Sequence, residues 1–343
     1  MKRLLAILAI AACGGDHDQP IDAAEDAPID TIDANPLDRL EGTGLCLDSG
    51  CMQISPDVHE YEPRFALWAD TATKRRWMFL PQGTQIDTSN MDRWVFPVGT
   101  KFWKEFTRDG TRVETRFITK RLANDNAPNA WFFVTYEWNA TQDAATALTT
   151  GKINANGTSH DIPSRNACKE CHESLRSRVL GFQAIQLDGD SAPGLLDIND
   201  LIAQGSLTVN PADGPTHFPL PGTAVDQAAL GYLHGNCGHC HNPDSPVHDM
   251  TPTELELDTT KLATVIGTPT YTTSVGVDAA IPFLDTETMI TYSKIIIPND
   301  PTNSSMTGRM TTTTATRHMP RLGSEMTDPT GFGALTAWIN TLP

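Results

Sequence analysis

Positive charge is scarce in this chain of 343 residues, which has 25 lysines and arginines against 42 aspartates and glutamates. The formal net charge is −17, and the only basic cluster is Lys74, Arg75 and Arg76. Nucleic-acid binding depends on clustered cations that neutralise phosphates. The composition therefore argues against a nucleic-acid-binding protein, and a protein partner is expected to present a basic docking face.

Several catalytic signatures are also missing. The sequence has no G-x-S-x-G, no H-E-x-x-H and no glycine-rich phosphate loop. These absences remove the common serine hydrolases, zinc proteases and nucleotide-binding enzymes from consideration. Any activity must therefore come from other residues.

Long hydrophobic runs are lacking. The apolar run Leu4 to Ala12 follows Lys2 and Arg3 and is too short to span a bilayer, so residues 1–12 are predicted to be an export signal. The run ends at Cys13 in a context that resembles a bacterial lipoprotein cleavage box. That resemblance implies an acylated Cys13 and a protein held at the periplasmic or outer-membrane surface by lipid alone. A plain secretory signal with an incidental cysteine is the alternative.

Residues 13–42 lack aromatic side chains and are strongly acidic. Asp16 to Glu41 contains nine acidic residues and one basic residue, Arg39. Such a composition cannot bury a core, so this segment is predicted to be a disordered tether.

Cysteine is infrequent, but its spacing is informative. Four of the seven cysteines lie in two C-x-x-C-H motifs, Cys168, Cys171 and His172 in the first and Cys237, Cys240 and His241 in the second. Two thiols at this spacing can form thioethers to the vinyl groups of one haem, and the adjacent imidazole can bind its iron. The motifs predict two covalently bound c-type haems, with His172 and His241 as proximal iron ligands.

Paired cysteines have two other common uses in proteins. A four-cysteine zinc site would combine both pairs, but Cys171 and Cys237 are much further apart in sequence than in a compact zinc module. A redox dithiol requires a βαβ setting, which neither motif has. The remaining pair, Cys46 and Cys51, is expected to close a short disulfide loop in an oxidising compartment.

Residues 43–151 are predicted to form an all-β, sandwich-like domain. Short runs rich in aromatic and β-branched residues alternate with turn signals. In Val113 to Thr119, alternate residues fall on opposite faces of an expected strand. Six of the seven tryptophans lie here, and we expect them to form the domain core rather than a glycan platform: Trp68, Trp77, Trp94, Trp103, Trp131 and Trp138.

Residues 152–222 are predicted to be the first haem-binding segment. Apolar residues from Leu175 to Leu187 have near-helical spacing, and a second helix is expected over Asp197 to Gln204, ending at Gly205. No methionine occurs between His172 and Met250, so the distal ligand of the first haem is not evident. The alternatives are an open iron or one of four histidines: His59, His160, His217 and His234.

Residues 223–343 are predicted to be the second segment, a mainly α region with an inserted β-hairpin. A capped helix over Asp226 to Asn236 leads into the second motif, and Gly331 to Leu342 forms a terminal helix. This arrangement, with Met319 before Pro320, resembles small cytochromes c with histidine and methionine axial ligands. The resemblance implies Met319 as the distal ligand of the second haem. Its rivals are Met306, Met310 and Met326.

Most of the chain after residue 52 resembles a family of exported bacterial dihaem cytochrome c-like proteins that join a β-rich domain to haem motifs. The resemblance is carried by FPVGTKFWKEF, VETRFITK, TYEWNATQDA, IPSRNACKECH, VLGFQAIQL, YLHGNCGHCHNP, IIIPNDPTNSSMTGRM and MPRLG. It implies single-electron transfer between redox partners. The alternatives are a dihaem peroxidase or oxidase with an open first iron, and a surface binding protein that uses the tryptophan-rich domain.

Overall fold

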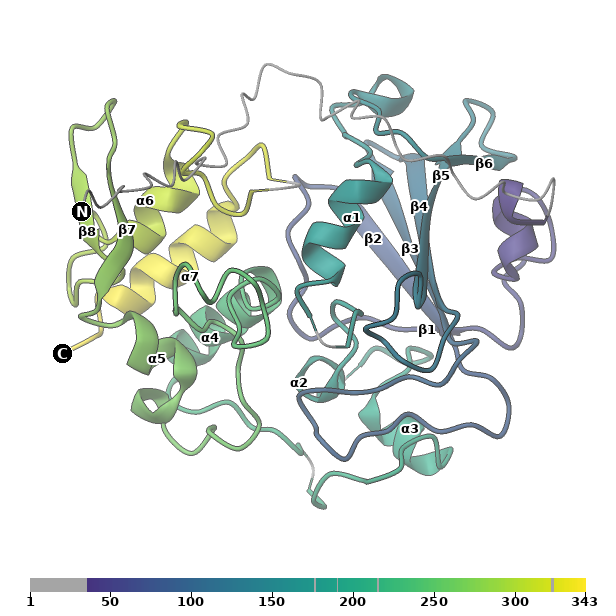
Figure 1. Ribbon diagram of the computed structural model, residues 1–343, viewed down its shortest axis with the longest axis horizontal. Helices are drawn as coiled ribbons and strands as arrows, with labels where there is room; N and C mark the ends of the chain where they lie inside the picture. Colours follow the sequence, from purple (N-terminus) through teal and green to yellow (C-terminus); the bar gives the residue numbers. More distant parts are fainter. Residues whose placement is uncertain (1–35, 176, 190, 215, 322–323) are drawn as a thin grey trace, which may run out of the picture.

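The computed structural model describes residues 36–343, apart from 176, 190, 215 and 322–323. A half built on a β-sheet and a mainly helical half lie side by side, with helix α1 (Arg165–His172) between them (Figure 1). The expected signal, Cys13 and most of the acidic tether fall outside the described residues. Within the described part, no helix is long and apolar enough to cross a membrane.

The β half contains a single antiparallel sheet in which each strand pairs with the next along the chain. Its strands are β1 (His59–Glu60), β2 (Thr73–Phe79), β3 (Lys101–Arg108), β4 (Thr111–Lys120), β5 (Trp131–Trp138) and β6 (Ala145–Leu148). The expected sandwich is therefore wrong for the described residues, because no second sheet packs on this one. The mixed α and β content is confirmed.

Both faces of the sheet are covered, which explains why one sheet suffices. On one face, Trp77, Trp103 and Phe117 are paired across β2, β3 and β4 and belong to a core with Leu40 and Leu45. The opposite face carries a second paired row that belongs to the main core of the helical half, namely Met78, Phe102, Ile118 and Phe133. A sheet buried on both sides does not need a partner sheet.

The N-terminal cover corrects the predicted tether. Two 3-10 helices, η1 (Pro36–Asp38) and η2 (Leu40–Thr43), occupy the last part of the segment expected to be disordered. Leu40 is fully buried, and the Thr43 hydroxyl accepts a hydrogen bond from the Trp103 indole at 2.8 Å. One leucine thus anchors an otherwise acidic segment. Just beyond it, Cys46 and Cys51 form a disulfide.

The tryptophans of the β half are mainly interior, as expected for core residues. Trp77, Trp94, Trp103, Trp131 and Trp138 are all buried. These five side chains are therefore not available as a surface platform for a glycan.

The region after α1 is less helical than its spacing predicts. Leu175 and residues 177–183 form turns and irregular backbone, and among the described residues that follow, α2 (Ala184–Leu187) is the first helix. Helix α3 (Ile198–Ala203) matches its prediction, since Asp197 caps it in a capping box and Gly205 adopts a positive φ after its end. The 3-10 helix η3 (Ala155–Gly157) precedes α1.

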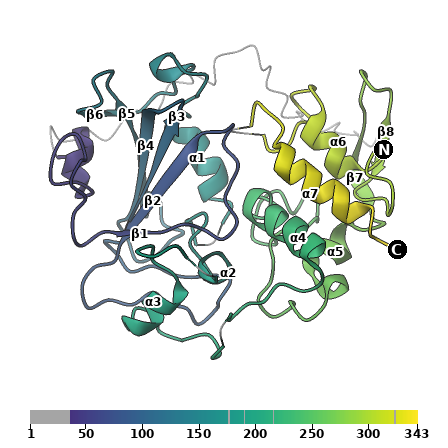
Figure 2. The ribbon, with the colours of Figure 1, turned by 180° about the vertical axis from the view of Figure 1, so that it is seen from behind.

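The helical half is organised by α4 (Ala224–Asn236) and α7 (Pro329–Ile339), which lie against each other (Figure 2). The inserted hairpin is confirmed as β7 (Asp278–Leu284) and β8 (Thr291–Lys294). The remaining elements are η4 (Val265–Gly267), α5 (Pro269–Ser274) and α6 (Ser305–Thr311).

Candidate haem-attachment site

The first motif lies on α1, which Ser164 caps by accepting a hydrogen bond from the backbone of Ala167. His172 ends the helix, and its Nδ1 lies 2.7 Å from the carbonyl oxygen of Arg178. The ring centroid of Phe133 lies 5.3 Å from that of His172. A hydrogen bond from Nδ1 fixes the tautomer and leaves Nε2 as the basic atom.

His172 is held in its neutral form. Burial is the largest cause that lowers its pKa, to about 4, and the nearby charges of Lys104 and Arg116 act in the same direction. The hydrogen bond to Arg178 and the Cys171 thiol oppose this shift. At neutral pH the imidazole is therefore uncharged, which is the state that binds a metal.

The second motif follows α4 directly. Cys237 caps the helix, and its amide donates to Leu233 at 2.9 Å. The carbonyl of His241 accepts from the amide of Leu255 at 2.8 Å. Gly238 is required by close packing, since a Cβ there would lie 2.8 Å from the Glu256 backbone.

His241 is neutral as well, and its side chain is half-buried. Burial lowers its pKa to about 4, assisted by the charges of His239 and Arg309, while the backbone of Thr253 acts against the shift. Its Nδ1 is buried without a well-formed hydrogen bond. The ring therefore lacks the well-formed Nδ1 hydrogen bond that orients His172.

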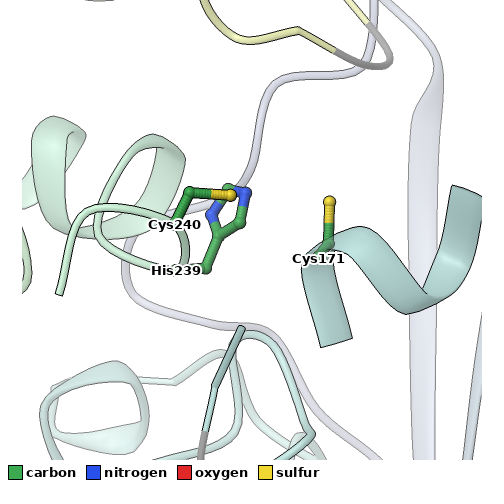
Figure 3. Close-up of side chains that lie close together, drawn as sticks. All are labelled: Cys171, His239 and Cys240. Atoms are coloured by element: carbon green, nitrogen blue, oxygen red, sulfur yellow. The ribbon is translucent and has the colours of Figure 1, made fainter. Parts of the chain in front are cut away.

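The structure brings the two motifs together. The sulfur atoms of Cys171 and Cys240 and a ring nitrogen of His239 all lie within 4.8 Å of one another. Figure 3 shows Cys171 on α1 across from the loop after α4, where the Cys240 sulfur points toward α1 and His239 lies beside it. The long sequence separation of the two motifs therefore does not exclude a shared metal site, because the fold brings the motifs into contact.

The contact between motifs polarises the thiols. A hydrogen bond with Cys240 is the largest cause that lowers the pKa of Cys171, to about 4, and His239 assists. The same hydrogen bond raises the pKa of Cys240. We assign the negative charge to Cys171 and the proton to Cys240. Burial raises the pKa of Cys237 to about 12 and also raises that of Cys168.

The side-chain amide of Asn242 lies between the two motifs. The buried side chain of Asn242 donates hydrogen bonds to Gly238 at 2.9 Å and to His239 at 3.1 Å, within the second motif. It also lies 3.5 Å from the carbonyl oxygen of Ser174, just after the first motif. One amide thus connects the two loops.

Met319 lies in the loop between α6 and α7. Its amide donates to the carbonyl of Arg309 at 2.8 Å, and the charge of Arg309 acts on His241. The loop is therefore tied to a residue near the second motif. Among the rivals, Met310 is buried in the core, Met306 packs against it, and Met326 is 50% exposed.

The histidines expected as alternatives for the first distal ligand have other partners. Both ring nitrogens of His234 and of His217 have hydrogen-bonding neighbours, and Nε2 of His160 lies 2.8 Å from Glu114. His59 lies in β1 and is exposed. None of these four lies beside His172 in the described contacts.

Sequence reasoning missed His239 and the basic side chains of the sheet. His239 is the second spacer residue of its own motif, so a histidine inside C-x-x-C was the available signal. Lys104 and Arg116 act on His172 from β3 and β4. They could not be assigned without the pairing of the strands.

The residues present fit a c-type haem at each motif. None of the four motif cysteines is in a disulfide. Each motif supplies a neutral, half-buried histidine, and Cys168 and Cys237 both pack against the apolar core. No family model matches the chain, and no curated protein or solved structure matches it.

Proposed function

We propose that this protein is a dihaem c-type cytochrome that passes single electrons between redox partners. The observation that carries the proposal is the meeting of two C-x-x-C-H motifs, each with two cysteines outside disulfides and a neutral, half-buried histidine. Haem iron supplies reversible one-electron chemistry when bound. Two such centres held next to each other suit relay of electrons through the protein.

The residues have separate roles in this proposal. Cys168 and Cys171 would anchor the first haem and Cys237 and Cys240 the second, each thiol adding its S–H across one vinyl group with no leaving group. His172 and His241 would present Nε2 to the iron atoms. Met319 would be the distal ligand of the second iron, where a thioether favours the ferrous state.

The cellular setting remains part of the proposal. Attachment of this kind is expected after export, at the periplasmic or outer surface, with Cys13 acylated. The net charge of −17 favours a redox partner with a basic docking face. Export also agrees with the disulfide between Cys46 and Cys51.

Mass spectrometry of chain exported together with a haem-maturation system tests the attachment. Peptides that contain Cys168 with Cys171, and Cys237 with Cys240, should each carry the mass of one haem. Free thiols in both peptides, together with bound zinc, would favour a thiolate and imidazole metal site at Cys171, His239 and Cys240 instead.

A dihaem peroxidase or oxidase is the second candidate. It is favoured by the partners of His160, His217 and His234, which leave no evident distal ligand for the first iron. An open first iron gives a high-spin ferric EPR signal that shifts with cyanide, and turnover of peroxide. Two low-spin signals that ignore cyanide support the electron carrier.

A further inference from the structure

Three basic side chains form a row across the sheet on the face toward α1. Arg76 of β2 is paired with Lys104 of β3, and Lys104 is paired with Arg116 of β4. Directly paired residues point to the same face of a sheet. We call these three residues the cation row. It spans two strand spacings, about 10 Å.

The cation row lies beside the first motif. The positive charges of Lys104 and Arg116 lower the pKa of His172, and Cys168 and Cys171 interact electrostatically with Arg116. The row that contains Phe133, which contacts His172, lies on this same face. Arg116 is therefore the member near the thiols, and the row extends away from them toward Arg76.

The compensation of these cations is uneven along the row. Arg116 pairs with Glu114, but Arg76 is 4% exposed and its Nη2 is buried without a hydrogen-bond partner. Lys104 and Arg116 both stack on the ring of Phe106, at 4.8 and 4.3 Å. Burial and the neighbouring cations hold the pKa of Lys104 well below its usual range.

Such an arrangement is costly for a protein that holds nothing there. Like charges directly opposite each other destabilise a sheet, and a buried cation without a hydrogen-bonded counter-ion, as at Arg76, is destabilising. The rest of the chain is acidic, so its general composition does not account for three cations at directly opposed positions on adjacent strands. A bound anion would supply the missing negative charge.

We propose that the cation row binds the propionate carboxylates of the haem at the first motif. This inference rests on the proposed function. The propionates of haem stand on the edge of the porphyrin opposite its vinyl groups, so they lie away from Cys168 and Cys171. Lys104 and Arg76 occupy the corresponding end of the row. The β half would then bind the propionates of the first haem.

The substitution Lys104→Met tests the assignment, because it removes the charge and keeps a long side chain. In a Cys168→Ser/Cys171→Ser chain that retains only the second haem, it should raise the guanidinium midpoint of unfolding. In the dihaem chain it should lower that midpoint and lower the reduction potential of the first haem. The opposite signs follow because the cation is unpaired in one chain and paired in the other.

Lys101→Met is the matched control. Lys101 lies on the same strand, its Nζ donates to the carbonyl of Thr43 at 2.8 Å on the other face, and its removal should leave the first potential unchanged. A rise of the midpoint in both chains with Lys104→Met would overturn the inference. Stabilisation of the dihaem chain by inorganic phosphate that is lost with Lys104→Met would also overturn it, since the cation row would then be free to bind another anion. A matured chain without haem overturns the proposed function as well.

Discussion

At the scale of single residues, burial sets the chemistry of the candidate site. His172 and His241 are kept neutral because they are removed from water, and Cys171 is ionised because Cys240 and His239 stabilise its charge. The sequence predicts the motif residues because their spacing is local. It cannot predict His239 as a neighbour of Cys171, since that contact joins two distant segments.

Replacement of Met319 by leucine tests its predicted role as a ligand. Loss of a thioether ligand should lower the reduction potential of the second haem by at least about 60 mV, a tenfold change in a one-electron equilibrium. Spectroelectrochemical titration measures the shift. Met326→Leu, at a position that is 50% exposed, is the control and should change nothing. An unchanged potential in Met319→Leu would assign the ligand elsewhere.

Lys74 gives a pH-dependent prediction. Burial, followed by the charges of Arg76 and Arg116, lowers the pKa of Lys74 to about 8 from an ordinary value of 10.5. Between these values the unfolded chain binds more protons than the folded chain, so the stability contributed by this group falls as pH drops from 10.5 to 8, and the full cost is present below pH 8.

The change Lys74→Met should therefore raise the free energy of unfolding at pH 7 by about 1 kcal/mol and have less effect at pH 10. Denaturant titrations at the two pH values measure it. Lys261→Met, at an exposed lysine paired with Asp258 at 3.1 Å, should change stability little at either pH. An equal effect of Lys74→Met at both pH values would refute the assigned cause.

At the scale of elements, local signals were reliable where a cap or turn defines the end of a helix. The capping boxes at Asp197 and Thr223 and the positive φ of Gly205 agree with the expected helices. Leu175 and residues 177–183 have helical spacing but form turns and irregular backbone, and Val179 and Phe182 are buried there in the main core. The sandwich prediction failed because strand patterns do not reveal what covers each face.

The packing of α4 against α7 depends on a glycine. A Cβ at Gly331 would lie 1.9 Å from the Tyr232 ring, whereas a Cβ at Gly333 would meet nothing within 4 Å. Gly331→Ala should lower the free energy of unfolding by about 3 kcal/mol through overpacking. Gly333→Ala should be neutral or stabilising by up to about 1 kcal/mol, because alanine favours helices. Chemical denaturation compares them, and equal effects would contradict the packing described.

At the scale of the whole molecule, two halves distant in sequence meet at the motifs. Cys171 and Cys240 would each bond to a porphyrin edge, so their approach within 4.8 Å puts the two haems in a position to interact. The sequence predicts that there are two sites but not their separation, which depends on how α1 and α4 pack. The acidic charge and the motifs can be read from the sequence, whereas the position of the cation row of the sheet beside the first motif cannot.

The proximity of the motifs predicts magnetic interaction between the two ferric haems. The EPR spectrum of the dihaem chain should differ from the sum of the spectra of two single-haem variants, Cys168→Ser/Cys171→Ser and Cys237→Ser/Cys240→Ser. Asn242→Ala, which removes the amide between the two loops, should weaken the interaction while both haems remain. Asn303→Ala, on the surface, is the control. A spectrum equal to the simple sum would show that the haems are too far apart.

The central claim is covalent attachment of two haems to this chain, and the pyridine haemochrome assay on purified, exported and matured protein tests it most directly. The account predicts two haems per chain, with the colour retained by the polypeptide after acid and organic extraction. Colourless protein, or haem that is extracted completely, would contradict it.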